Sequence, residues 1–312
     1  MFQLGLKISL LVGLVLGTCI GVPQLSQKRL EQTYLAAIGD KHARLDSLPS
    51  PRILLVGGSS MAFGTDSRML SDSLHVPVQN LANQIVLGSK FMLNEAKSCL
   101  RKGDVVVVGF EYHINSKGSL DQQLLAADNY KPALQYIQFA DWKEELTARL
   151  QHQIGTVKLT LGALLAGNHD IEPRIQDTVS VFFRKGFSKE GDLLSHLNNP
   201  PQLPLQHAEL PNVMDEHAIL EDIEQFCGVA KQKGVQVFYV FPPYTASAFG
   251  QNQGTIQQIE HDFQTSPIRQ LGKPQDYVYP DTLFFDSVYH LNAEGRKRRT
   301  LQLIRQLKPI FQ

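Results

Sequence analysis

Short apolar runs alternate with amphipathic stretches along most of the chain. The continuous apolar runs predict buried strands, at 52–56, 76–81, 104–109 and 235–241. The amphipathic stretches have apolar residues at helical spacing and predict helices, at 89–100, 216–233 and 293–307. This alternation predicts an α/β fold with a mostly parallel sheet flanked by helices, and places active residues at the carboxyl ends of strands.

The pattern changes between 113 and about 214. Helical stretches alternate there with polar loops, and the segment 198–204 is rich in proline. We interpret 113–214 as a largely helical insertion, a cap or a partner surface, within a domain that spans 52–312. Residues 28–51 are then a linker that precedes this domain.

The N-terminal residues 1–27 are predicted to be a membrane anchor or a signal. No charged residue occurs from 8 to 27, and a stretch of about twenty such apolar residues can cross a bilayer. We favour an uncleaved single-pass anchor, with the domain outside the cytoplasm. A cleaved secretory signal is the alternative because Lys7 precedes the run, although no convincing cleavage site follows. Cys19 also weakly imitates a lipoprotein box.

A glycine stripe within this span would let another membrane helix approach closely. Gly13, Gly17 and Gly21 recur every four residues. The stripe suggests a partner in the membrane, although glycine is also common in such spans.

The charge balance excludes an electrostatic attraction to nucleic acid. The 30 lysines and arginines are matched by 30 aspartates and glutamates. The spacing of the three cysteines, Cys19, Cys99 and Cys227, fits neither a zinc site nor a disulfide framework. We therefore expect local recognition of the substrate, and no cofactor or metal.

The sharpest chemical motif is Gly57-Gly58-Ser59-Ser60, which follows the first predicted strand directly. A serine at a tight strand-to-helix turn exposes its hydroxyl, and neighbouring N–H groups can face a developing oxyanion. A phosphate-binding loop is the rival interpretation, but the Gly-Lys-Ser/Thr that it needs does not follow. A glycine-rich turn without catalytic role is the simplest alternative.

A second motif near the C-terminus supplies the partners that a nucleophilic serine needs. Asp286 lies four residues before His290, just ahead of the last predicted helix. His290 would accept the proton of Ser59, and Asp286 would orient and stabilise the imidazolium. Together the two motifs predict a Ser59-His290-Asp286 acyl-transfer site.

With these motifs the chain resembles the SGNH, or GDSL-like, hydrolase superfamily. That superfamily begins with a strand ending in Gly-Asp-Ser and ends with an Asp-x-x-His loop. The resemblance is to its membrane-anchored bacterial branch, which includes alginate O-acetylation and teichoic acid D-alanylation proteins, and Phe63-Gly64 after the turn fits that branch. It covers 52–111 and 235–312 and implies a three-layer, flavodoxin-like fold.

The turn can be aligned with the family in two ways. The branch aligns its nucleophile with Ser59, which leaves Ser60 as a hydrogen-bond donor or as the N-cap of the next helix. The alternative alignment makes Ser60 the nucleophile.

Two positions depart from the family's oxyanion hole. Ala82 stands where the family has a glycine, and its N–H is still expected to serve as a donor. Glu111 stands where the family has an asparagine, and a carboxylate cannot donate unless it is protonated. Either Asn83 replaces the missing donor, or Glu111 serves the acceptor substrate, or catalysis is weak.

A metallophosphoesterase is a less well supported alternative. Gly167-Asn-His-Asp170 imitates one block of such enzymes, and Asp40 and Asp104 would belong to others. The metal ligands of these enzymes follow strands, but Asp40 lies in the predicted linker and Asp104 precedes its strand. His113 is close enough to the end of the third strand to be near the predicted site.

The sequence thus predicts a membrane-anchored acyltransferase or esterase for O-acyl groups, most simply acetyl, of a cell-envelope glycan. The alternative is a catalytically weak scaffold that binds glycan or assembles with a membrane-bound O-acyltransferase.

Overall fold

The computed structural model describes residues 31–165, 181–205, 210 and 216–311, together with positions 7, 13, 17 and 21. The predicted span at 8–27 lies outside the described residues except at its three glycines, which are helical and exposed. The motif at 167–170 also lies outside them. Over the described part of the chain, no helix combines the length and the apolar character needed to cross a membrane.

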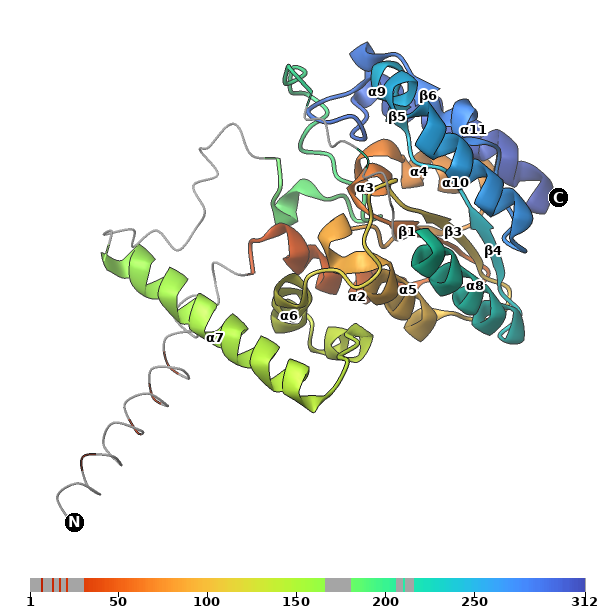
Figure 1. Cartoon of the computed structure of the whole chain (residues 1–312). Coiled ribbons are helices and arrows are strands. Elements are labelled where there is room, and N and C mark those ends of the chain that lie inside the picture. The colour runs from red at the N-terminus through yellow and green to blue at the C-terminus, as the bar shows by residue number, and fades with distance from the viewer. Residues whose placement is uncertain are drawn as a thin grey trace.

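A fully parallel sheet of four strands lies at the centre of the domain, in the order β2-β1-β3-β4 (Figure 1). Each strand overlaps one of the predicted runs: β1 (Ile53–Gly57), β2 (Val78–Asn80), β3 (Val105–Gly109) and β4 (Gln236–Tyr239). Every residue of β1 and β3 is buried. Helices cover both faces of a parallel sheet, and its inner strands are therefore apolar without alternation.

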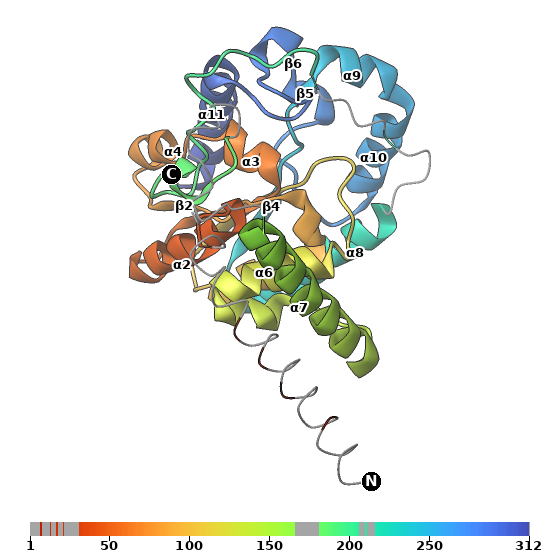
Figure 2. The same cartoon turned by 90° about the vertical axis from the view of Figure 1, so that its left-hand side faces the viewer.

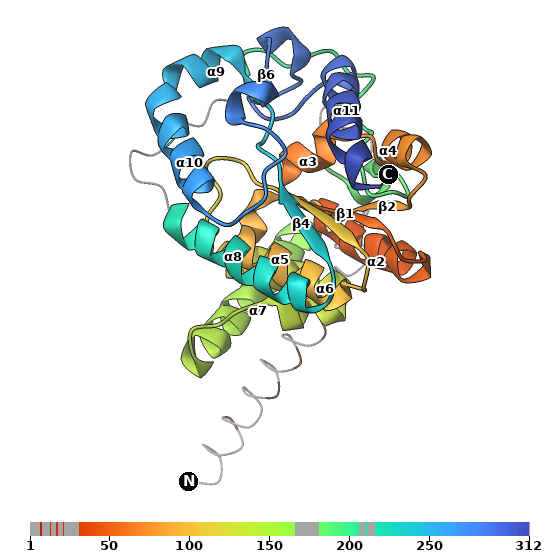
Figure 3. The same ribbon diagram turned by 90° about the vertical axis from the view of Figure 1, so that its right-hand side faces the viewer.

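Helices form a layer on each side of this sheet. On one side α5 (Gly88–Cys99) packs against α8 (Glu216–Gln232), and on the other α11 (Ala293–Leu307) packs against α3 (Ser59–Gly64) and α4 (Ser67–Leu74) (Figure 3). The molecule is therefore a three-layer α/β structure, as the sequence predicts.

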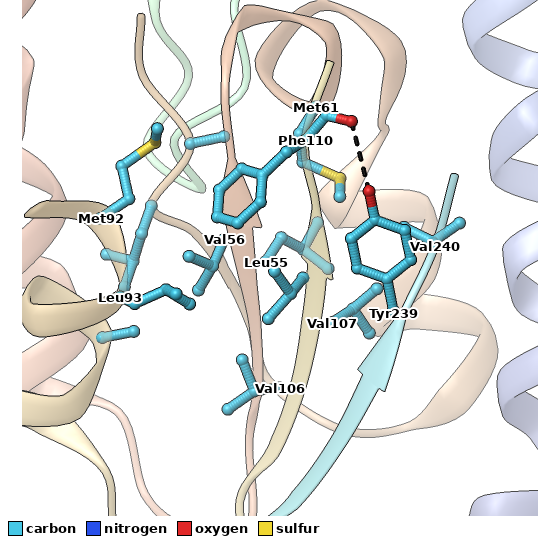
Figure 4. Packing of buried hydrophobic residues seen from close by; sticks show 14 of the residues in the cluster. Leu55, Val56, Met61, Met92, Leu93, Val106, Val107, Phe110, Tyr239 and Val240 are labelled. Carbon is cyan, nitrogen blue, oxygen red and sulfur yellow. Dashed lines mark hydrogen bonds between the residues drawn. The ribbon is translucent and has the colours of Figure 1, made fainter. Parts of the chain in front are cut away.

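The hydrophobic core is continuous across the carboxyl ends of β1, β3 and β4 (Figure 4). Leu55 and Val56 of β1 lie beside Val107 of β3, and Met61 of α3 packs over them. The Tyr239 hydroxyl donates to the Phe110 carbonyl at 3.5 Å, which ties the ends of β4 and β3 together. This packing fixes the strand ends from which the site is built.

The segment predicted as a linker is partly built into the domain. The helices η1 (Tyr34–Ala36) and α2 (Ala37–Ser47) pack on the sheet edge and bury Leu35, Ile38 and Leu45. These three apolar residues recur at helical spacing, and their burial makes 34–47 part of the fold.

The first half of the insertion, up to residue 165, is largely helical. The helices there are α6 (Leu120–Asn129), η3 (Lys131–Tyr136) and α7 (Trp142–Leu165). Helix α7 lies along α6 at one edge of the molecule, and His152 joins it to Asp121 and Asp128 (Figure 2).

The described second half of the insertion, 181–205, runs mainly through turns, with the short η4 (Arg184–Gly186). Buried Asp192 accepts hydrogen bonds there from Ser67 and Asn80 and so ties this segment to α4 and β2. The segment is therefore packed into the domain.

The remaining elements lie toward the C-terminal end of the chain or connect larger ones. They are η2 (Ile85–Leu87), β5 (Tyr244–Thr245), α9 (Ala246–Gln251), α10 (Gln253–Thr265), η5 (Pro274–Tyr277), β6 (Val278–Tyr279), η6 (Asp281–Leu283) and η7 (Lys308–Ile310). Strands β5 and β6 pair in parallel as a separate two-stranded sheet.

Candidate active site

Ser59 lies at the carboxyl end of β1, one of the two inner strands. Gly58 is the N-cap of α3, and Ser59 is the first residue of that helix. The side chain of Ser59 is half-buried, whereas Ser60 is fully buried, and within the described residues the Ser60 hydroxyl has no hydrogen-bond partner. The turn therefore presents Ser59 and keeps Ser60 inside.

Ser59, His290 and Asp286 form one continuous line of hydrogen bonds. Ser59 Oγ lies 2.8 Å from His290 Nε2, and His290 Nδ1 lies 2.7 Å from Asp286 Oδ1. Since the carboxylate accepts the proton on Nδ1, Nε2 is left as the acceptor for the serine proton. The arrangement can activate the Ser59 hydroxyl as a nucleophile.

The loop that carries His290 is closed by its own backbone. Phe285 N–H donates to the His290 carbonyl at 2.8 Å, and Phe284 pairs with Leu291 in an antiparallel bridge. Asp286 and His290 are therefore held at the mouth of a short hairpin-like turn just before α11. This explains how a spacing of four residues brings the carboxylate to the imidazole.

Aromatic rings fix the plane of the His290 imidazole. The Phe63 ring stacks on it with centroids 3.9 Å apart and planes 10° from parallel. His196 lies behind Phe63, at 4.5 Å between centroids, and its Nε2 donates to the Leu291 carbonyl at 3.1 Å. Burial lowers the pKa of His196 to about 3, which keeps this ring neutral and adds no positive charge beside His290.

Glu111 lies on the opposite side of Ser59. Its side chain is buried, its Oε1 accepts the Ser60 N–H at 2.6 Å, and the same oxygen lies 3.2 Å from Ser59 Oγ. Oε2 has no hydrogen-bond partner within the described residues. The single proton of the Ser59 hydroxyl thus has two acceptors in reach, His290 Nε2 and Glu111 Oε1.

The absence of a side chain at Gly58 makes room for this carboxylate. A Cβ at Gly58 would lie 2.1 Å from Glu111 Oε2 and 2.6 Å from Oε1. Both distances are far below van der Waals contact. Glycine at 58 and glutamate at 111 therefore fit each other sterically.

The expectation that Ala82 supplies an oxyanion donor is not met. Its N–H donates to Asn80 Oδ1 at 3.0 Å, because the buried Asn80 side chain turns back on its own loop. The Ser60 N–H is likewise engaged, by Glu111. Two backbone donors beside the nucleophile are thus already in use.

Asn83 keeps one donor available. Its N–H donates to the Gly57 carbonyl at 3.1 Å, and its Oδ1 accepts from Gln84 N–H at 3.0 Å. Its Nδ2 makes no hydrogen bond within the described residues. Asn83 therefore stays a candidate for the donor that the superfamily takes from asparagine.

Three further titratable groups interact with Glu111: His113, Tyr34 and Tyr289. The sequence predicts only His113 to be near the site. Burial lowers the pKa of His113, with Glu111 opposing this change and His290 reinforcing it. Burial also raises the pKa of Tyr34 and Tyr289, and Glu111 adds to both shifts. Tyr34 comes from the predicted linker, and no local sequence motif marks it as a neighbour of the site.

Across the described ranges, no three His, Cys, Asp or Glu side chains are grouped as a metal site would need. The chemistry available is that of a serine, an imidazole and carboxylates.

Comparison with known proteins finds matches only among solved structures, at low sequence identity. No family model matches the chain, and no curated protein does. Among solved structures, a protein assigned to the G-D-S-L lipolytic family from Desulfitobacterium hafniense DCB-2 matches with a TM-score of 0.39 and 10% identity, over 83% of this chain and 100% of its own. An acetyl xylan esterase from the rumen bacterium Butyrivibrio proteoclasticus matches with a TM-score of 0.34 and 8% identity, over 84% of this chain and 64% of its own.

Proposed function

We propose that the protein is a serine-dependent acyl-transfer enzyme that acts on O-acyl esters. The observation that carries this proposal is the line of hydrogen bonds from Ser59 through His290 to Asp286. Ser59 would attack the acyl carbonyl while His290 takes its proton. His290 would then return that proton to the departing alcohol, and Asp286 would stabilise the imidazolium.

The acyl-enzyme would be released by a second alcohol or by water. In either case His290 takes a proton from the incoming hydroxyl and returns it to Ser59 Oγ as the acyl group leaves. Glu111 bears on this choice because an ionised carboxylate 3.2 Å from Ser59 Oγ would repel a developing oxyanion. The carboxylate must move aside when an acyl group binds, and an acceptor hydroxyl could then donate to it.

We further propose that the enzyme moves an acetyl group onto or off a glycan of the cell envelope. The support is the sequence resemblance to the membrane-anchored branch and the uncharged stretch at 8–27. The same features support an inner-membrane anchor with the domain outside the cytoplasm.

Covalent labelling with a fluorophosphonate probe tests the nucleophile. The wild-type protein should be labelled, and Ser59→Ala should lose the label while its thermal melting stays within a few degrees. Ser60→Ala is the matched control, because its hydroxyl is buried one residue away, and it should keep the label. Undiminished labelling of folded Ser59→Ala would reject the assignment.

The position of Glu111 favours a second candidate function, a catalytically weak scaffold that binds glycan or a membrane-bound O-acyltransferase. The carboxylate already holds the Ser60 N–H, so the site as it stands offers few donors to an oxyanion. Turnover of p-nitrophenyl acetate by the purified protein, together with recovery of no integral membrane partner from solubilised membranes, would exclude the scaffold. Absence of both labelling and turnover in a folded protein would favour it.

A further inference from the structure

A hollow between α2 and the segment 184–189 has cationic side chains at five of its ten lining residues. Its volume is about 350 Å³, and a single carboxylate, Asp40, lies among its walls. The cationic side chains come from α2, from η4 and from the turn after it: Lys41, Arg44, Arg184, Lys185 and Lys189. Since the whole chain has no net charge, this is a local concentration of positive charge.

Part of this charge is neutralised within the protein. Asp40 accepts two hydrogen bonds from Arg184, at 2.7 and 2.6 Å. Lys189 lies 3.8 Å from Glu190 at the rim. These two cations therefore have carboxylate partners of their own.

The other three cations have no carboxylate partner within the described residues. Arg44 donates to the Val78 carbonyl at 2.9 Å and to Gln79 Oε1 at 2.6 Å, which are neutral acceptors. Lys185 is exposed and forms no ion pair with a described residue. The third cation, Lys41, donates to the Ala82 carbonyl.

Lys41 is the most unusual of the three because it is a buried cation. It is 2% exposed, and its Nζ lies 4.3 Å from the centre of the Phe187 ring. Burial lowers the pKa of Lys41 to about 7, against weaker opposing effects of Glu95 and Asp192. An anion in the hollow would stabilise the protonated form of this side chain.

We propose that this hollow is a binding site for a doubly charged oxyanion, a phosphate or sulfate group, held by Arg44, Lys41 and Lys185. A guanidinium fork with two ammonium groups suits a tetrahedral oxyanion, which presents several acceptor oxygens at once. A volume of about 350 Å³ lies in the range of small-molecule sites. It admits the phosphate or sulfate group together with part of the molecule that carries this group. None of these three cations belongs to the hydrogen-bonded line of Ser59, His290 and Asp286.

Isothermal titration of the full chain with sulfate, inorganic phosphate and acetate at constant ionic strength tests the site. Sulfate and phosphate should bind, and acetate should bind much more weakly. Lys185→Ala removes an exposed cation and should weaken sulfate binding by roughly tenfold or more, the loss typical of one hydrogen bond to a charged group. Arg44→Gln should weaken it at least as much.

Lys102→Ala is the matched control for Lys185→Ala. Lys102 is also an exposed lysine, it lies just before β3, and it does not line the hollow. Its replacement should leave sulfate binding unchanged. Equal effects of Lys102→Ala and Lys185→Ala, no binding of sulfate or phosphate, or acetate binding as tightly as sulfate would each overturn the proposal.

The pH dependence of sulfate binding is a second readout, and it can be read on the unaltered protein. Sulfate keeps both charges throughout, so a change of affinity reports the protein. Affinity should fall as the pH rises through about 7, where free Lys41 loses its proton, and binding above that pH should take up a proton. Affinity that is flat over this range would exclude Lys41 from the site.

A sugar phosphate distinguishes the two sources of the ligand. If glucose 1-phosphate binds more tightly than inorganic phosphate, the hollow recognises a phosphate borne on a glycan. Equal affinities identify the free ion as the ligand.

Discussion

The two sides of Ser59 differ in how far they follow the catalytic pattern that the sequence predicts. On one side His290 and Asp286 lie at 2.8 and 2.7 Å along a single line, and Phe63 stacks on the imidazole. On the other side Glu111 holds the Ser60 N–H, and Ala82 N–H is used by Asn80. One side is prepared for proton transfer, whereas the other is not prepared for a negative charge.

This difference teaches that the nucleophile and the oxyanion hole are separable requirements. Proton transfer needs hydrogen bonds between three side chains, and local loops can position each of these side chains. Stabilising an oxyanion needs several donors that are free and aimed at one point. A chain can therefore keep the first and alter the second, and the variants below test each side in turn.

The largest effect should come from breaking the proton-transfer side. Asp286→Asn keeps the size of the side chain but no longer fixes the tautomer of His290, and kcat on an acetyl ester should fall by about 10⁴-fold. Steady-state kinetics with p-nitrophenyl acetate measures this. Asp281→Asn, a change in the same loop, should leave kcat near the wild-type value, and a loss below tenfold in Asp286→Asn would place the orienting carboxylate elsewhere.

Repairing the other side should raise the activity. Glu111→Asn replaces an acceptor by a donor beside Ser59, and kcat/KM for ester hydrolysis should rise by about 10²- to 10³-fold, the value of one such donor. Glu111→Gln keeps the length of the side chain and tests the charge alone.

A fall in activity for both variants at position 111 would contradict this expectation. It would instead show that the carboxylate takes part in the reaction, as a base for the acceptor hydroxyl. Thermal melting of each variant separates this outcome from unfolding.

The ring stack on His290 should have a smaller effect. Phe63→Leu removes an aromatic contact of about 0.5 to 1.5 kcal/mol, so kcat should fall by up to roughly tenfold as the imidazole gains freedom. Phe182→Leu is the matched control, because its ring is 38% exposed and its centroid lies 6.3 Å from that of His290. An equal loss in both variants would mean that stacking does not position His290.

The smallest effect at neutral pH concerns His196. The pKa of His196 is about 3 in the folded protein and about 6.5 in the unfolded chain. Between these two values the unfolded chain binds a proton at His196, whereas the folded protein does not. Stability should therefore decrease between about 6.5 and 3, by at most about 1.4 kcal/mol per pH unit from this group. Urea unfolding of His196→Gln should show a shallower loss over that range, and an unchanged slope would contradict it.

The sequence predicts the framework well because its signals are local. Each strand of the sheet overlaps a continuous apolar run, and the serine turn and the Asp286-to-His290 spacing lie within single loops. The structure brings these loops together because β1 and the turn before α11 meet at one edge of the sheet.

The rest depends on contacts between distant segments, which no local pattern reveals. The Ala82 N–H is lost as an oxyanion donor because the buried Asn80 side chain accepts it, and this depends on a side-chain rotamer. The segment 28–51 is predicted to be a linker, yet the burial of Leu35, Ile38 and Leu45 makes α2 part of the fold. Likewise the segment 181–205 is held by contacts with distant residues, among them the hydrogen bonds from Ser67 and Asn80 to buried Asp192.

The close fit between Gly58 and Glu111 has a consequence for how this turn can vary. The Gly-Asp-Ser turn of the SGNH pattern has an aspartate where Gly58 stands, and its third block has an asparagine where Glu111 stands. Here Glu111, two residues after β3, brings its carboxylate to Gly58, and a Cβ at 58 would lie within 2.6 Å of both of its oxygens and of Ile85 Cγ2. The two positions are therefore expected to covary among related chains, with glutamate at 111 only where 58 is glycine.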